Sequence, residues 1–490
     1  MKRQLLPKIP AGALWIFVLL VISACQGAVT PTETAQPTDT VVPLATSIPP
    51  TPTPRSTPTL APSPTPARWN FPTPDAQPMP ACLIAELPLL DDSEGRTKRF
   101  AWSPAGEALA YVAPDEEHEG ALLVVAAPDF DSPHRLALPA LSDPAWSPDG
   151  TRLAFVTRRA EDELQTVMVV NADGTDGHDL FPGEEAQTDV GAGFKAIEGW
   201  WDAERLVVAT NCGSGCRDLL MVDLAQQTRE VLFPEGPKGV SQYAWSPNHS
   251  ALVVTAGFNP QIGLLAPQEG DLLSYPGFET VHWLSGIGAE DESWANFWTF
   301  FADWSPDSTH VLFLRQPVEG REPPELWLWD VVSAEASFLL PGVVAAQWSP
   351  DGERIAFLTW GAPVFDPEGR WTAVVADLQS PYPLSVGLYH WAADEVVTLF
   401  KIGEVAFDYS NLASSPPIPL TLAWSPDGSQ LVYGDGTGQT GVLAADGVSY
   451  YALPAQARPP SRNARWSPDG RWLALPDGSR LQIYAIPCAH

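Results

Sequence analysis

The sequence predicts an all-β protein, and its composition, its internal repeats and its turn chemistry all support this class. The chain of 490 residues contains 37 Gly, 52 Pro and 20 Trp but only 4 Met. Such a composition suits many short strands joined by tight turns better than a bundle of helices. Hydrophobic residues make up 45% of the chain, which is sufficient for a large core.

A twelve-residue pattern recurs along most of the chain. Clear copies, with Trp-Ser-Pro after the first residue, begin at Ala101, Ala145, Ala244, Asp303, Gln347, Ala423 and Arg465, and weaker copies begin at Gly199 and His390. The leading tryptophans are Trp102, Trp146, Trp201, Trp245, Trp304, Trp348, Trp391, Trp424 and Trp466. Most of their spacings lie near 44 residues, the length of one four-stranded propeller blade.

Each copy has the chemistry of a turn between two antiparallel strands. In the segment from Ser147 to Gly150, Pro148 fixes φ at the second turn position, the Asp149 side chain can accept bonds from nearby amides, and the glycine relaxes the exit. The apolar run that follows, Leu153 to Phe155, has no polar alternation. This is expected of a strand that is covered on both faces.

These copies resemble the WD-like β-propeller repeat of the TolB type, over about residues 98 to 487. The resemblance implies one β-propeller of eight or nine four-stranded blades, because the unit at Trp391 spans only 33 residues and is either a ninth blade or an incomplete one. That family includes periplasmic scaffold proteins and the propeller halves of serine peptidases. The resemblance therefore implies a fold rather than an activity.

The two ends of the repeat region are expected to meet. The last unit ends before an outermost strand, and Leu83 to Leu90 reads as a strand with no unit of its own, so the N-terminal strand is predicted to complete the last blade. Four cysteines besides Cys25 allow three pairings. Closure favours a disulfide between Cys82 and Cys488, and this leaves Cys212 and Cys216 as a local pair.

Residues 1–25 have the parts of an export signal: basic residues, an apolar run from Ala11 to Ile22, and small residues before Cys25. The segment Ile22 to Cys25 resembles the lipobox of bacterial lipoproteins, which implies that Cys25 is lipidated. The alternative is an ordinary secretory signal with an incidental cysteine. Residues 26–80 are rich in Pro and Thr and are predicted to form a disordered stalk, with residues 81–490 as the propeller.

Charge and motifs exclude several functions. A net charge of −32 lacks the basic footprint of nucleic-acid binding. No catalytic motif, metal-binding spacing or cofactor-binding loop is found, and Cys212 and Cys216 lack the further ligands of a zinc site. Carboxylates in the central funnel of a propeller leave one enzymatic alternative, a cell-envelope hydrolase or lyase acting on polysaccharide or peptide.

A segment that we call the aromatic insertion, residues 278–301, lengthens one repeat to 59 residues. Its candidate ligand-binding residues are Trp283, Glu290, Asp291, Glu292, Trp294 and Trp298. Aromatic faces beside carboxylates suit stacking on a sugar or gripping a peptide. The alternative is that these rings only pack the insertion against its own blade.

These observations predict a lipid-anchored, extracytoplasmic propeller, at the cell surface or in the periplasm. We expect a monomeric domain without a cofactor that acts as a binding or scaffold protein. Its expected partners are proteins or carbohydrates of the cell envelope, and its expected contact with the membrane is the N-terminal lipid.

Overall fold

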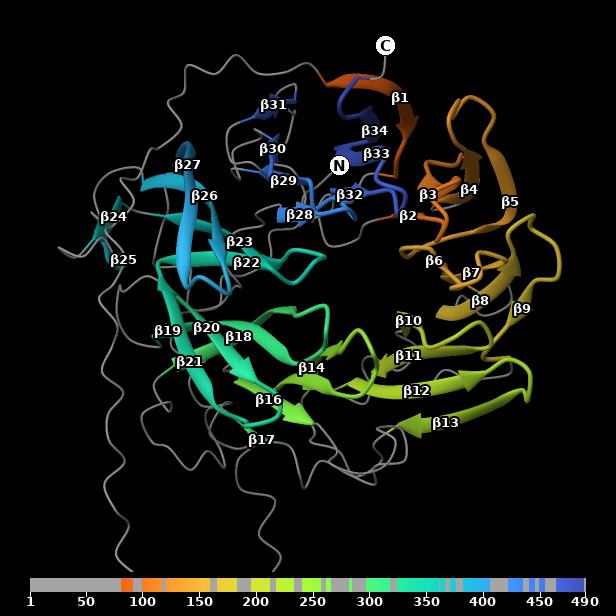
Figure 1. The fold of residues 1–490 in the computed structure, drawn as a ribbon. Coiled ribbons are helices and arrows are strands. Elements are labelled where there is room, and N and C mark those ends of the chain that lie inside the picture. The colour runs from red at the N-terminus through yellow and green to blue at the C-terminus, as the bar shows by residue number, and fades with distance from the viewer. Residues whose placement is uncertain are drawn as a thin grey trace, which may run out of the picture. The chain divides into compact units, whose positions relative to one another are not determined.

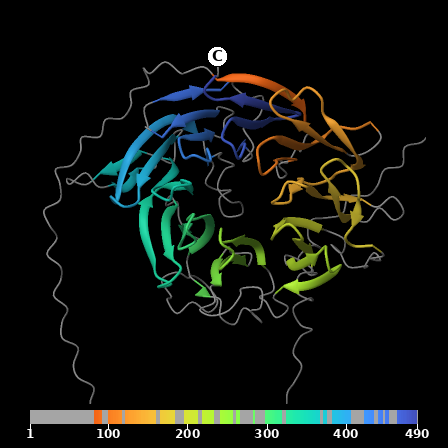
Figure 2. The ribbon, with the colours of Figure 1, turned by 45° about the vertical axis from the view of Figure 1, so that its right-hand side comes forward.

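Eight four-stranded sheets form the blades of a β-propeller, shown in Figure 1 and from a second direction in Figure 2. The computed structural model describes residues 81–90, 99–116, 120–158, 165–182, 195–211, 217–232, 240–256, 261–265, 282–283, 297–317, 324–360, 362–365, 371–375, 382–405, 422–434, 440–445, 449–453 and 464–488. Within these ranges every regular element is a β-strand.

Blades 1 to 7 are antiparallel meanders whose strands follow in chain order from the innermost to the outermost. Blade 1 comprises β2 (Phe100–Trp102), β3 (Ala108–Ala113), β4 (Ala121–Ala126) and β5 (His134–Pro139). Blade 2 comprises β6 (Ala145–Trp146), β7 (Arg152–Arg158), β8 (Gln165–Asn171) and β9 (His178–Asp179). Blade 3 comprises β10 (Lys195–Trp200), β11 (Arg205–Asn211), β12 (Arg217–Asp223) and β13 (Thr228–Leu232). Blade 4 comprises β14 (Val240–Trp245), β15 (Leu252–Ala256), β16 (Gln261–Leu265) and β17 (His282–Trp283).

The second half of the ring continues this pattern with two differences. A hairpin is inserted in blade 6, and the outermost strand of blade 8 comes from the N-terminal end of the propeller region. Blade 5 comprises β18 (Phe297–Trp304), β19 (His310–Pro317), β20 (Glu325–Asp330) and β21 (Ala336–Pro341). Blade 6 comprises β22 (Val343–Trp348), β23 (Arg354–Trp360), β26 (Tyr382–His390) and β27 (Glu395–Val405). Blade 7 comprises β28 (Leu422–Trp424), β29 (Gln430–Gly434), β30 (Thr440–Ala444) and β31 (Tyr450–Ala452). Blade 8 comprises β32 (Arg465–Trp466), β33 (Trp472–Asp477), β34 (Arg480–Ala485) and, as its outermost strand, β1 (Cys82–Pro88).

Blade 6 carries the insertion, which explains the short repeat spacing that follows Trp391. A hairpin of β24 (Ala362–Phe365) and β25 (Trp371–Val375) interrupts the connection between β23 and β26, and β25 lies beside β21 of blade 5. The ring therefore has eight blades and not nine. Trp391 begins the turn between β26 and β27, so its unit is the outer half of blade 6.

Blade 3 also corrects the assignment of one repeat tryptophan. Trp200 pairs with Leu206, as Trp146 pairs with Leu153 in blade 2, so Trp200 and not Trp201 occupies the repeated position. Because Trp200 and Trp201 are adjacent, the sequence alone does not show which of them occupies the repeated position.

The unbroken apolar runs form strands that are buried on both faces. In β7, Leu153 and Phe155 pack with residues of blade 1, whereas Ala154 and Val156 pack with residues of blade 3. Side chains alternate between the two faces of a strand, and here a neighbouring blade covers each face. The strand lacks polar alternation because both of its faces are buried, as the sequence predicts.

Eight hydrophobic clusters follow the same rule, because each joins two neighbouring blades. One of them combines Leu109 and Tyr111 of blade 1 with Ile483 of blade 8, so the series closes on itself. Each blade therefore completes its core only by contact with the blades on either side.

The repeated tryptophans add a directional link at most of these boundaries. The indole N–H of Trp146 donates to the carbonyl oxygen of Ala101 in blade 1 at 3.0 Å. The same bond joins Trp102 to Arg465, Trp200 to Ala145, Trp304 to Ala244, Trp424 to Gln347, and Trp466 to Ala423. Because an N–H donor has to meet its acceptor, these bonds fix the register between blades as well as the packing.

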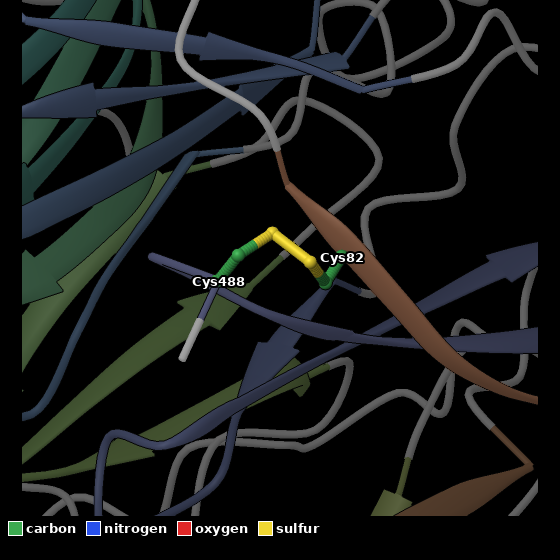
Figure 3. The surroundings of a disulfide bond; sticks show 2 residues. All are labelled: Cys82 and Cys488. Atoms are coloured by element: carbon green, nitrogen blue, oxygen red, sulfur yellow. A yellow bond between two sulfur atoms is a disulfide. The ribbon is translucent and has the colours of Figure 1, made fainter. Parts of the chain in front are cut away.

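The two ends of the chain's propeller region close the ring, as the sequence predicts. β1 pairs antiparallel with β34, from Cys82 opposite Ala485 to Pro88 opposite Arg480. Leu87 and Leu89 are buried in the cluster shared by blades 8 and 1. A disulfide joins Cys82 to Cys488, with 5.2 Å between the two Cα atoms (Figure 3). This is the pairing that closure favours.

The tryptophan link can be measured by a conservative substitution. Trp146→Phe keeps a ring between blades 1 and 2 but removes the bond to Ala101. Trp348→Phe is the matched control, because it stands at the same repeat position and its indole N–H has no hydrogen-bond partner. We expect Trp146→Phe to lower the free energy of unfolding in urea by about 1 kcal/mol more than Trp348→Phe does. Equal losses in the two variants would contradict the role of the bond.

Candidate interaction surface

The strand order gives the ring two unlike faces. In an antiparallel meander, the connections between first and second strands and between third and fourth strands lie on one face, which we call the turn face. Those between second and third strands and between successive blades lie on the other, the loop face. The Trp-Ser-Pro turns are thus on the turn face. The hairpin β24–β25 and the connection 284–296 start from the loop face.

Internal hydrogen bonds hold the turns of the turn face. The Ser147 hydroxyl donates to Asp149 at 2.6 Å and accepts from the N–H of Arg152 at 2.9 Å. The serine bond is the main cause that holds the pKa of the Asp149 carboxyl below its usual value, helped by the N–H of Thr151. The same serine contacts recur in the turns that begin at Ser305, Ser349, Ser425 and Ser467. These carboxylates therefore serve the turns.

Neighbouring turns also lie against one another. Gly150 has a φ of +72°, and a Cβ atom placed on it would lie 3.6 Å from the Pro104 ring of the preceding blade. Gly352 stands in the same relation to Pro306, and Gly428 to Pro350. The proline of one turn and the glycine of the next thus form a seam at four boundaries of the turn face, between blades 1 and 2, 5 and 6, 6 and 7, and 7 and 8.

The seam departs from this pattern between blades 3 and 4. His249 replaces the glycine at a φ of 58° and stacks on Trp201, with 4.2 Å between ring centroids. Trp201 also makes an edge contact with Trp245. Burial lowers the pKa of His249. Trp201 occupies the position at which the other turns have serine. Its stacking with His249 gives the turns of blades 3 and 4 a contact in place of the proline–glycine contact.

The structure places two of the six candidate ligand-binding residues on described strands. Trp283 lies in β17, the outermost strand of blade 4, and Trp298 lies in β18, the innermost strand of blade 5. Glu290, Asp291, Glu292 and Trp294 fall outside the described residues. The connection between the two strands thus starts at the rim of one blade and ends at the centre of the next, on the loop face.

Trp298 is committed to packing, since its side chain is only 7% exposed. The next residue, Thr299, accepts a hydrogen bond from the N–H of Ile262 in blade 4 at 2.9 Å. This bond fixes the C-terminal end of the aromatic insertion where it joins blade 5. A role for Trp298 in stacking on a ligand is therefore not supported by its position.

Two charged side chains on the innermost strands have no distinctive motif in the sequence, Asp303 and Arg465. The Asp303 carboxylate accepts a hydrogen bond from the backbone N–H of Trp348 at 2.8 Å and so links blades 5 and 6. Desolvation raises the pKa of Asp303 to about 7. Burial lowers the pKa of Arg465 in blade 8, against the effect of Asp143. The sequence signal for these two residues is the position before each repeated tryptophan. Four of the clear repeats have alanine there, whereas Asp303 and Arg465 are charged.

No group of three or more histidine, cysteine or carboxylate side chains suited to a metal ion occurs within the described ranges. Among the carboxyl groups described, Asp303 is the one whose pKa is raised. It lies at a boundary between blades and bonds to backbone there. We therefore assign it to the packing of the ring.

The other cysteine predictions concern residues outside the described part. Cys25, proposed for lipidation, lies outside the described residues, and so does the proposed stalk, residues 26–80. Cys212 and Cys216 lie there too, in the connection between Asn211 and Arg217, which pair with each other in blade 3. Their pairing stays a prediction. In the ranges that the structure describes, no helix has the length and apolar character needed to cross a membrane.

The state of Asp303 predicts an unusual pH dependence. Its folded-state pKa lies above the ordinary value of 3.8, so its protonation favours the folded state, and this contribution is lost as the pH rises through about 7. Asp303→Asn keeps an acceptor for Trp348 without the charge. We expect this variant to be more stable than the parent at pH 8, by on the order of 2 to 4 kcal/mol, with the difference shrinking toward pH 4.

Urea unfolding at a series of pH values measures this difference. Asp149→Asn is the control, because the lowered pKa of that carboxyl gives stability that is lost as the pH falls. A stability difference between Asp303→Asn and the parent that does not change with pH would refute the assignment.

The described residues define an eight-bladed β-propeller closed by its own N-terminal strand. No protein-family model matches the chain, and no curated protein does. Among solved structures, the chain is similar to the Dos1 propeller, with 13% identity, a TM-score of 0.50 and coverage of 83% of this chain and 96% of that one. At this identity the likeness establishes the fold alone.

Two further solved structures are similar at lower TM-scores. TolB from Acinetobacter baumannii has 15% identity and a TM-score of 0.32, and the match covers 61% of this chain and 66% of that one. A chain of the Mitotic Checkpoint Complex has 16% identity and a TM-score of 0.39, with 70% and 88% covered. The function is therefore argued from this chain's own residues.

Proposed function

We propose that the protein is an extracytoplasmic, lipid-anchored propeller that binds a protein or glycan of the cell envelope on its loop face. The observation that carries this proposal is the difference between the two faces. Five turns of the turn face are held by bonds between their own serines and carboxylates, whereas the loop face receives most of the longer connections, the one between β16 and β17 excepted. Loops on a rigid scaffold commonly carry binding function.

The aromatic insertion supplies the chemistry of the proposed site. Trp283 and Trp294 offer flat apolar faces, and Glu290, Asp291 and Glu292 offer three carboxylates in one connection. Aromatic rings with convergent polar groups are common in sites for sugars and peptides. The fixed ends of the connection, in β17 and β18, hold it to the scaffold.

The disulfide and the leading segment support the proposed location. Structural disulfides persist in oxidising compartments, so the bond between Cys82 and Cys488 favours a protein outside the cytoplasm. The apolar run before Cys25 then acts as an export signal and the cysteine carries the lipid. Several acyl chains give stable attachment to a membrane, whereas one chain is marginal.

Lipidation can be tested separately from binding. In cells that express the full chain, we expect Cys25→Ser to abolish incorporation of labelled fatty acid and to move the protein from the membrane to the soluble fraction. The double variant Cys82→Ser/Cys488→Ser serves as the control and should still be labelled. Labelling of Cys25→Ser at the parental level would exclude Cys25 as the anchor.

Binding can be tested by capture from cell-envelope extracts. We expect Trp294→Ala to reduce the captured partner at least about five-fold, because stacking on an aromatic ring contributes on the order of 1 kcal/mol or more. Phe338→Ala is the control, since this ring is 44% exposed on the outer strand of the adjacent blade 5. Replacing Glu290, Asp291 and Glu292 by their amides should weaken capture of a basic peptide more than that of a neutral glycan. Unchanged capture by Trp294→Ala would remove the aromatic insertion from the site.

A further inference from the structure

The position of the disulfide along β1 is informative. Cys82 is the first residue of β1, so the chain that precedes the propeller joins the ring at this residue. The opposite end of β1, at Pro88, pairs with Arg480. Cys488 follows β34, whose C-terminal residue Ala485 lies opposite Cys82. The crosslink is therefore at the end of β1 that any force on the preceding chain reaches first (Figure 3).

We propose that the disulfide between Cys82 and Cys488 is a tension clamp. It passes force from the N-terminal segment directly to β34, so that β1 is not peeled from blade 8 when the propeller holds a partner. This inference rests on the proposed function, in which the segment before Cys82 is tethered to a membrane.

The non-covalent contacts of β1 are arranged as such a clamp requires. Near the tether, Leu83 and Ile84 are 47% and 42% exposed, and the pairing is irregular between Leu83 and Ala85. At the far end, Leu87 is 5% exposed and packs in the cluster shared by blades 8 and 1. Glu86 bonds there to Gln482 and Arg480. The weakly packed end of the strand thus carries the covalent bond.

Force applied at the end of a strand breaks the pairs of an antiparallel ladder one after another. Without the crosslink, tension would meet the exposed residues Leu83 and Ile84 before it reached Leu87. With the crosslink, tension passes to β34, which is paired on both sides, with β1 and with β33. Leu481, Ile483 and Tyr484 of this strand are fully buried. Two ladders and these side chains then have to yield together.

Loss of β1 would also open the ring. Its residues Leu87 and Leu89 belong to the cluster that joins blade 8 to blade 1, and its removal exposes the edge of β34. The clamp therefore protects the one boundary whose outer strand is contributed from the other end of the repeat region.

A relocated crosslink distinguishes a tension clamp from simple ring closure. Glu86 and Gln482 are partners in the register of β1 and β34, and their side chains are hydrogen-bonded at 3.1 Å. The variant Glu86→Cys/Gln482→Cys, in the background Cys82→Ser/Cys488→Ser, keeps the ring covalently closed. It leaves residues 82–85 to receive the force without a crosslink.

The test is single-molecule pulling on the full chain that follows Cys25. One handle is attached at the N-terminus and the other to a peptide tag inserted at Val332, which is 80% exposed in the turn between β20 and β21. We expect the parent to yield at the highest force. The double-serine variant and the relocated crosslink should show a first extension at roughly half that force, because forced unfolding follows the step that is loaded first.

Urea unfolding separates the two roles. The relocated crosslink should match the parent in urea although it yields early under tension, whereas the double-serine variant should be weaker in both measurements. Equal forces for the parent and the relocated crosslink, or for the parent and the double-serine variant, would overturn the proposal. The pulling experiment holds the chain by a handle and not by a lipid. Its result therefore does not depend on the outcome of the Cys25→Ser lipidation test.

Discussion

The structure depends on burial of the middle strands of each blade by the blades on either side. Leu153 and Ala154 are adjacent in the chain, yet they belong to two different clusters, one shared with blade 1 and one with blade 3. No single blade can bury both faces of such a strand. The hydrophobic effect therefore favours the complete ring, and the tryptophan N–H bonds add the correct register to it.

Much of this arrangement was readable in the sequence because the repeat is local. The turn from Ser147 to Gly150 specifies its own hydrogen bonds, and the run from Leu153 to Phe155 specifies a strand buried on both faces. The blade number was not readable, since the outer half of blade 6 imitates a repeat at Trp391. Nothing local reports that the hairpin β24–β25 separates the two halves of that blade. The repeated tryptophan of blade 3 is also ambiguous in the sequence, because Trp200 and Trp201 are adjacent.

The candidate site was less predictable than the fold, for a physical reason. Aromatic residues in a connection can stack on a ligand or pack on a blade, and the sequence gives both the same composition. Trp298 illustrates the difference, because it follows the acidic cluster in sequence but is buried in blade 5. Asp303 is not recognisable from the sequence, because the residue that bonds to its carboxyl group, Trp348, lies 45 residues away in the chain.

The pairing of β1 with β34 also has a consequence for the order of assembly. A ribosome makes β1 before any other strand of the propeller and β34 after all of them, so the first strand has no partner until synthesis of the ring is nearly complete. Until then, Leu87 lacks the surfaces that bury it, and Cys82 has a free thiol. Cys212 and Cys216 are made before Cys488, so in a chain that is oxidised too early Cys82 can pair with one of them instead, and correct crosslinking depends on timing as well as on proximity.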